Sequence, residues 1–361
     1  MKRKQISAFT LVELLVVVSI IALLVSILLP SLQRARDQAK TVKCMAHQGG
    51  LAKAALTYVS EENDWIPGSP GTSGSVILGQ DWGAANVVDL PRAPVQTYDW
   101  AGPLAAVQLG MKNLPTNRVL RWKELISGPF ECPSNRFIAE PWEGSDPSGV
   151  FPNQKLVSYN MMRNMLYWEN GGDAPVIGDD SYDLTRGGIA DGATLRPGFR
   201  PQLGQIGNPS EKVFISDGSR FVDESNPAAI RLDFDVNWAA RHGGAFADGG
   251  PTGQDQYTRS FKQGEPEKFF AYRHRKGRKS GSQTQDKIDN TNGLVASHWD
   301  GHAEWLSAGK SRIPNRWWPK GSGIPLSALN NKVILGLLDS VGNDPSAFLA
   351  LFPNNKYEIK R

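Results

Sequence analysis

The sequence has little cysteine and lacks the short motifs of several common enzyme classes. Two cysteines occur among 361 residues, too few for the disulfide framework of a small secreted domain. There is no Gly-x-Ser-x-Gly turn, no His-Glu-x-x-His pair and no phosphate-binding loop, the signatures of α/β hydrolases, zinc proteases and P-loop enzymes. We therefore predict no catalytic residues and no cofactor, and we expect that the chain is not an enzyme.

Charge of neither sign dominates the chain. The formal net charge is +4, and three of the cations, Lys2, Arg3 and Lys4, lie at the N-terminus. A basic run occupies residues 273–279, with Tyr272 beside it. Because a nucleic-acid surface needs a wide basic face with interleaved aromatic side chains, we interpret this run as a solvated loop. We expect no nucleic-acid partner.

Residues 9–29 form a long apolar run that contains one charged residue, Glu13. A secretory signal peptide has an apolar core of about 7–15 residues and a small-x-small cleavage site after it. This run is longer, and no Ala-x-Ala directly follows it. It is long enough to cross a bilayer as a helix, which takes about 20 residues. A carboxylate in lipid costs about 2.5–3.5 kcal/mol at the centre and less near the interface, so Glu13 is a candidate functional residue.

Residues 8–14 read Ala-Phe-Thr-Leu-Val-Glu-Leu and closely resemble the N-terminal signal of type IV prepilins and type II secretion pseudopilins. That family has a short basic leader, a small residue (usually Gly) before the cut, and then Phe. The resemblance implies that prepilin peptidase cuts between Ala8 and Phe9 and methylates the new Phe9 amine; Ala8 stands where the family usually has Gly. It also implies that Glu13 pairs with the Phe9 amine of a neighbouring subunit and fixes the register of assembly.

The resemblance divides the chain into four parts. These are a leader peptide at 1–8, the transmembrane half of a long helix at 9–29, its soluble half at 30–62, and a globular pseudopilin-like domain at 63–361. Pro30 is predicted to kink the helix, because proline removes a backbone hydrogen bond and clashes with the preceding turn. Gly49 and Gly50 mark either close packing or a break.

The expected location follows from the anchor and the leader. A bias of Lys and Arg keeps the leader on the cytoplasmic side. We therefore expect a single-pass protein of the cytoplasmic membrane, with the globular domain on the periplasmic or extracellular side or in a surface filament. The expected partners are prepilin peptidase, other pilin or pseudopilin subunits, and the membrane itself.

Beyond the helix, 37 glycines and 24 prolines in the chain favour turns, loops and short strands. Strands are predicted at 156–162 and 212–217, a hairpin at 293–306 with its turn near Asp300-Gly301, and a short helix at 326–338. The fold class is therefore α+β: a pilin-like long N-terminal helix, membrane-spanning in its first half, packed on an antiparallel sheet with long loops.

Two further features of the chain resemble large pseudopilin-like and prepilin-type proteins, the second of them those of one bacterial group. One is the pair Cys44 and Cys132, which either form a disulfide in an oxidising compartment or remain two buried thiols. The other is a C-terminal signature in which Arg-His is followed, after a spacer, by Asp-Gly-His. His274 and Asp300-Gly301-His302 match its halves, although the spacer here is longer. Residues 241–249 hold a rival copy without the final His, and the later pair is favoured because a better strand follows it.

The alternation of His298, Asp300 and His302 offers a second interpretation. On one continuous strand these side chains would share a face and would suit a divalent metal. An Asp-Gly turn would break that alternation, so we favour a hairpin in which Asp300 satisfies turn N–H groups. The metal site is kept as the lesser alternative.

Three classes of function stay open. The first is a subunit of a filament or secretion machine. The second is an anchored surface protein that binds carbohydrate or metal, for which Trp317-Trp318 are candidate contacts unless they pack in an edge. The third is an anchored metal-dependent hydrolase. The N-terminal resemblance favours the first.

Overall fold

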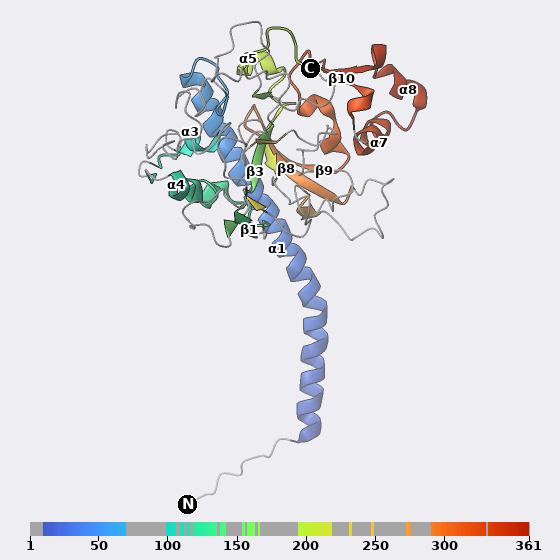
Figure 1. Cartoon of the computed structure of the whole chain (residues 1–361). Coiled ribbons are helices and arrows are strands. Elements are labelled where there is room, and N and C mark those ends of the chain that lie inside the picture. Colours follow the sequence, from blue (N-terminus) through green and yellow to red (C-terminus); the bar gives the residue numbers. More distant parts are fainter. Residues whose placement is uncertain are drawn as a thin grey trace, which may run out of the picture.

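The computed structural model places a globular part at one end of a long protruding helix (Figure 1). It describes residues 10–69, 99–105, 109–111, 114–115, 118–135, 138–141, 154–155, 157–162, 165–166, 194–218, 231–232, 247–248, 272–275, 290–329 and 331–360.

The helix α1 (Leu11–Glu61) runs for 51 residues. Thr10 and Glu13 start it with a capping box: Thr10 Oγ1 accepts a hydrogen bond from Glu13 N at 3.3 Å, and Glu13 Oε2 accepts one from Thr10 N at 2.9 Å. These bonds satisfy N–H groups that have no partner within the helix. Pro30 lies inside α1, which continues on both sides of it. Figure 1 shows α1 changing direction gently before it enters the globular part; a kink at Pro30 itself stays a prediction.

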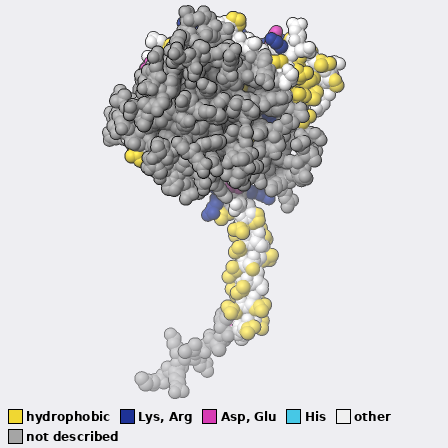
Figure 2. All heavy atoms as spheres, viewed as in Figure 1, with side chains coloured by type: hydrophobic (Ala, Val, Ile, Leu, Met, Phe, Trp, Pro, Cys, Tyr) yellow, Lys and Arg dark blue, Asp and Glu magenta, His cyan; other side chains and the backbone are white. Residues whose placement is uncertain are grey.

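The two halves of α1 have opposite surroundings. In the first half, the large apolar side chains are exposed, and Figure 2 shows them along the protruding part of the helix. In the second half, one face is buried, by Cys44, Gln48, Leu51, Ala52, Ala54, Ala55, Tyr58 and Val59. The first half therefore has no partner within the chain as described, while the second half is part of the core.

The main sheet has six strands in the order β6-β3-β4-β8-β7, and β9 also pairs with β8. The strands are β3 (Tyr159–Met162), β4 (Val213–Asp217), β6 (Ala247–Asp248), β7 (His274–Arg275), β8 (Asn292–His298) and β9 (Ala303–Ser307). Every pairing is antiparallel except that of β3 with β6. α1 contacts β4, β7, β8 and β9, so the helix lies across this sheet and the predicted α+β fold is confirmed.

Short elements surround this centre. The helical ones are α3 (Ala101–Pro103), α4 (Arg118–Glu124), α5 (Leu203–Ile206), α7 (Asn331–Ser340), α8 (Pro345–Ala350) and five 3-10 turns, η2 (Gly128–Phe130), η6 (Lys310–Arg312), η7 (Pro314–Arg316), η8 (Leu326–Ala328) and η9 (Pro353–Asn355). β1 (Ile138–Pro141), β2 (Gln154–Lys155) and β5 (Arg231–Leu232) form a second sheet, and β10 (Gly323–Pro325) pairs with β11 (Lys356–Glu358).

Large aromatic side chains fill the core beside the sheet. Phe214 of β4 contacts Trp299 with ring centroids 4.7 Å apart and Trp100 at 5.6 Å. Trp317 and Trp318 are also buried, with 0% and 1% of their surface exposed. The packed-edge interpretation of that pair is therefore right, and the alternative in which they contact carbohydrate is wrong, because no face of either ring reaches the surface.

Gly49 and Gly50 lie in the packed half of α1 without interrupting it. A Cβ atom added to Gly49 would lie 3.7 Å from both Ala303 Cβ and Gly301 O, whereas one added to Gly50 would meet nothing within 4 Å. Of the two predicted alternatives, the structure shows close packing, at Gly49, against the turn between β8 and β9.

Replacing Gly50 with alanine is expected to raise the free energy of unfolding by about 0.4–1 kcal/mol, because the change restricts the unfolded chain and meets no steric obstacle. Thermal unfolding of the detergent-solubilised protein would measure it. Gly301→Ala is the opposing control: its φ of +89° suits glycine, so a loss of about 1–2 kcal/mol is expected. An unchanged or lower stability for Gly50→Ala would contradict the open environment seen at that position.

Candidate functional site

The N-terminal half of α1 carries the first candidate site. Ala8 and Phe9, the predicted cleavage and methylation residues, lie outside the described residues. Glu13 is described, and its Oε2 accepts hydrogen bonds from Thr10 N at 2.9 Å and Thr10 Oγ1 at 2.8 Å. Among the described residues, α1 is the one helix long and apolar enough to cross a membrane; its best 18-residue window has a mean hydropathy of 3.0 and no buried surface.

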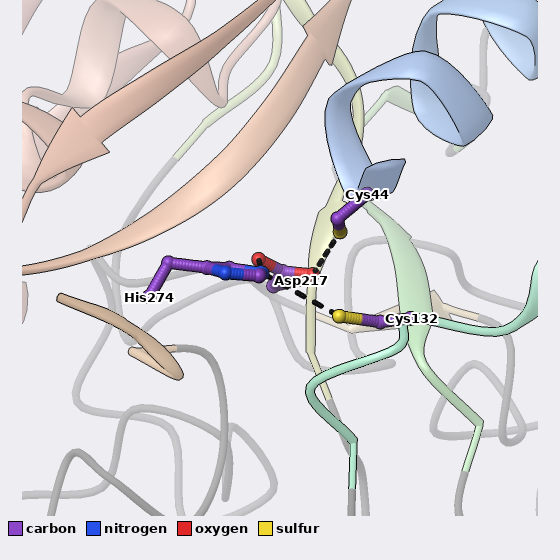
Figure 3. Close-up of side chains that lie close together, drawn as sticks. All are labelled: Cys44, Cys132, Asp217 and His274. Atoms are coloured by element: carbon purple, nitrogen blue, oxygen red, sulfur yellow. Dashed lines mark hydrogen bonds and ion pairs between the residues drawn. The ribbon is translucent and has the colours of Figure 1, made fainter. Parts of the chain in front are cut away.

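Four side chains from distant parts of the sequence meet in the interior beneath the helix (Figure 3). They are Cys44, Cys132, Asp217 and His274, and we call them the Cys–Asp–His cluster. All four residues are buried, and one ligand atom from each lies within 4.8 Å of the others. Asp217 is a site residue that the sequence did not single out; a carboxylate ending the apolar strand Val-Phe-Ile-Ser-Asp was the available signal.

Strand β8 brings Asp217 and His274 together. β9 pairs with β8 along one edge from Gly293 to Ser297, so β4 and β7 share the other edge. β4 ends at Asp217, and β7 begins at His274, opposite Gly293. The last residue of one strand therefore lies next to the first residue of another.

The helix and a turn supply the two thiols. Cys44 is the first buried residue of α1 and points from the helix toward Asp217 (Figure 3). Cys132 follows η2 and begins a turn that Asn135 N closes by donating to Cys132 O at 2.8 Å. Since α1 contacts both η2 and β4, the cluster lies where three separate segments meet the helix.

Contacts within the cluster are short. His274 Nε2 is 3.1 Å from Asp217 Oδ2 and 3.4 Å from Cys132 Sγ. Cys44 Sγ donates to Asp217 Oδ1 at 3.3 Å. Both carboxylate oxygens and the inner imidazole nitrogen are therefore directed at one small volume between the two sulfur atoms.

Neighbouring groups fix the orientation of His274 and Asp217. Thr41 Oγ1 donates to Asp37 O at 3.0 Å, which leaves its lone pairs to accept from His274 Nδ1, also at 3.0 Å. Val295 N donates to Asp217 Oδ2 at 2.7 Å. The arrangement places the Nδ1 proton of the imidazole on the outer side and Nε2 on the inner side.

Gln48, one turn beyond Cys44, continues this outer layer. Its Nε2 donates to Val295 O at 3.1 Å and to Asp217 Oδ1 at 3.3 Å. Tyr159 of β3 brings its hydroxyl to 3.4 Å from Cys44 Sγ. With the bond from Thr41 to His274 of β7, the helix is thus joined to four strands by hydrogen bonds around a single buried carboxylate.

Burial and mutual contact shift the pKa values of the cluster. Burial alone would lower the pKa of His274, but the Asp217 carboxylate outweighs it and raises the pKa to about 9. Burial likewise opposes ionisation of Asp217, yet His274 and Arg273 hold its pKa below the usual range. A hydrogen bond with Cys44 lowers the pKa of Cys132 to about 6, whereas burial raises that of Cys44. The cluster therefore contains an imidazolium–carboxylate pair and one readily ionised thiol.

Cys44 and Cys132 are both free thiols in the structure. Their sulfur atoms belong to the same compact group of ligand atoms, and a disulfide between them stays a prediction.

A second group, His298, His302 and Glu304, lies at the turn between β8 and β9. The two imidazoles stack with centroids 4.2 Å apart and an angle of 8°. His298 Nε2 lies 3.1 Å from Glu304 Oε1, which also pairs with Arg316 Nη1 at 3.0 Å. These three residues are close enough to share a metal ion, but the guanidinium already compensates the carboxylate.

Asp300 stands outside that group. It accepts from His302 N at 3.1 Å and contacts His302 Nδ1 at 2.5 Å, so the hairpin interpretation describes it well. The two halves of the C-terminal signature lie at opposite ends of β8. His274 pairs with Gly293 near the start of the strand, whereas Asp300-Gly301-His302 follows its last residue, His298. The strand between them spans on the order of 17 Å. They form no common site.

Comparison with known proteins finds a match to a sequence motif at the N-terminus. The sequence model described as the prokaryotic N-terminal methylation motif matches residues 3–29. No curated protein matches the chain significantly, and neither does any solved structure. The match does not extend to residues 274–302, so the C-terminal signature stays a prediction. The chain thus carries the prokaryotic N-terminal methylation motif, and this motif and its α+β architecture are consistent with the type IV prepilin and pseudopilin-like family.

Proposed function

We propose that this protein is a membrane-anchored pilin-like subunit that prepilin peptidase cuts between Ala8 and Phe9. In this proposal the mature protein assembles with other pilin or pseudopilin subunits into a filament of the type II secretion or type IV pilus kind. Its role is to build that assembly, and it is not an enzyme. The large globular part suits a minor or tip subunit, because bulky domains crowd a filament surface.

The observation that carries the proposal is the unpartnered apolar half of α1. Residues 11–29 rise about 28 Å at 1.5 Å per residue, close to the ~30 Å hydrocarbon core of a bilayer. Large apolar side chains exposed around a whole helix need lipid or protein around them. Lipid supplies this cover before assembly, and the corresponding helices of neighbouring subunits supply it afterwards.

Glu13 is placed to act in that second environment. Among the described residues, both hydrogen bonds of the Glu13 side chain use Oε2, and Oε1 is the second acceptor of the carboxylate. A carboxylate packed among apolar helices requires a cationic partner, and the Phe9 amine of an adjacent subunit is the cation that cleavage would create. In this scheme the leader and the new amine lie on the cytoplasmic side, and the globular part lies outside.

Mass spectrometry of the protein from cells that contain a prepilin peptidase tests the proposal. The mature chain is expected to begin at a methylated Phe9, and Ala8→Leu is expected to abolish cleavage because a bulky side chain replaces the small one at the cut. Ala8→Gly is the matched control and should be cut at least as well as the native chain. A chain that still begins at Met1, or one that has lost the whole apolar run, would contradict the proposal.

A further inference from the structure

We propose that the Cys–Asp–His cluster is a structural zinc site that fixes α1 to the globular part. The ligands would be Cys44 Sγ, Cys132 Sγ, one oxygen of Asp217 and His274 Nε2. This inference does not depend on the proposed function, since it concerns a group at the base of the helix that neither cleavage nor assembly uses.

The size of the cluster fits one ion. Zinc binds sulfur at about 2.3 Å and nitrogen or oxygen at about 2.0–2.2 Å, so the ligand atoms of a tetrahedral site lie about 3.3–3.8 Å apart. His274 Nε2 lies 3.1 Å from Asp217 Oδ2 and 3.4 Å from Cys132 Sγ, and Cys44 Sγ lies 3.3 Å from the other carboxylate oxygen, Asp217 Oδ1. No separation exceeds 4.8 Å. A small contraction or expansion of side chains would complete the coordination shell.

The donor set selects zinc among the common divalent ions. Calcium and magnesium take oxygen ligands, while thiolate and imidazole together suit zinc. The two cysteines would bind as thiolates and His274 through its unprotonated inner nitrogen, and the protons that these groups carry beforehand pass to solvent. Two thiolates and a carboxylate then carry three negative charges. The ion and the nearby Arg273, which donates to Ser158 O at 3.1 Å, balance them.

The outer layer has the organisation expected around a metal. A histidine ligand usually donates its other N–H to a fixed acceptor, which sets its tautomer. Thr41 Oγ1 is that acceptor for His274 Nδ1, because its own proton goes to Asp37 O. Asp217 is held by Val295 N and Gln48 Nε2.

The site would be structural rather than catalytic. Four protein ligands close the shell, and all four residues are buried, whereas a catalytic zinc keeps a position open for water or substrate. The ligands come from α1, the turn after η2, β4 and β7. One ion would therefore hold α1 to strands β4 and β7 and to the turn at the same point.

Elemental analysis of the full chain, purified in detergent without a metal-affinity tag and reconstituted with zinc, tests this. One zinc per chain is expected for the native protein, and near none for His274→Gln and Cys132→Ser. His302→Gln is the matched control, since it removes a histidine but leaves the cluster intact, and it should keep one zinc. Removal of zinc by a chelator is expected to lower the Tm by about 10 °C or more.

Cobalt in place of zinc gives a readout that does not require any variant to fold. The native chain with Co²⁺ is expected to show tetrahedral d–d absorption and a thiolate-to-cobalt charge-transfer band. Four results would overturn the assignment: a native chain that takes up no zinc, a mass that shows a Cys44–Cys132 disulfide, zinc retained by both cluster variants, or zinc lost in His302→Gln. The last would place the ion at the hairpin group instead.

Discussion

Glu13→Ala is expected to lower incorporation into filaments by about 100-fold or more while leaving the protein in the membrane. In a packed bundle of apolar helices, removing one partner of a buried ion pair leaves the other charge uncompensated. This destabilises the packed state by about 3–5 kcal/mol. In the proposed assembly, the affected charge is the Phe9 amine that cleavage would create. The ratio of subunit in sheared filaments to subunit in the membrane fraction measures the effect.

Thr10→Ala separates the charge of Glu13 from its role as a helix cap. The Thr10 hydroxyl makes two of the three hydrogen bonds between Thr10 and Glu13. Its loss breaks the capping box, which costs about 1 kcal/mol, but keeps the Glu13 carboxylate. Assembly should then fall far less than in Glu13→Ala. Equal damage from the two changes, or normal assembly of Glu13→Ala, would remove the pairing role and leave Glu13 as a residue that starts the helix.

Asp217→Ala is expected to lower the free energy of unfolding of the globular part by about 3–5 kcal/mol. The carboxylate accepts from Val295 N at 2.7 Å and pairs with His274 Nε2 at 3.1 Å. Without it a buried imidazolium and a buried N–H lose their partner, and Gln48 loses one of its links to the sheet. Thermal or denaturant unfolding in detergent measures the change.

Two variants control for this result. Asp217→Asn keeps the volume and one acceptor oxygen, so its loss should be smaller than that of the alanine variant. Asp300→Ala removes an exposed carboxylate whose described hydrogen bonds are with His302, and it should cost less than about 1 kcal/mol. If Asp217→Ala proved no worse than Asp300→Ala, the cluster would not be the joint between α1 and the sheet.

Local patterns predicted what is local in the structure. The apolar run and the loose helical spacing beyond it predict α1 almost to its end at Glu61. They do so because residues three and four positions apart share one face of a helix, so the pattern is visible in a short stretch of sequence. The hairpin of β8 and β9 is similarly evident from Asp300-Gly301, since Gly301 adopts a φ of +89° that few other residues tolerate. The short helix predicted at 326–338 is instead a 3-10 turn followed by α7.

The cluster was beyond the reach of such patterns. His274 and Asp217 become neighbours because two short strands share one edge of β8, a pairing between segments far apart in the chain. The sequence offered His274 within a signature and the cysteines as a pair. It gave no reason to place them around the same carboxylate, because sequence spacing carries no information on contacts made through a third strand.

The continuity of α1 has a mechanical consequence. One continuous helix is exposed and apolar in its first half and packed against the globular part in its second half. Within Leu11–Glu61, no flexible linker separates the two halves. A force or torque applied to the N-terminal end of α1 while a subunit leaves the membrane would therefore be transmitted through the helix to the globular part. In the proposed assembly, extraction from the membrane would turn the globular part together with α1, and the angle of α1 would determine which side of the globular part faces outward.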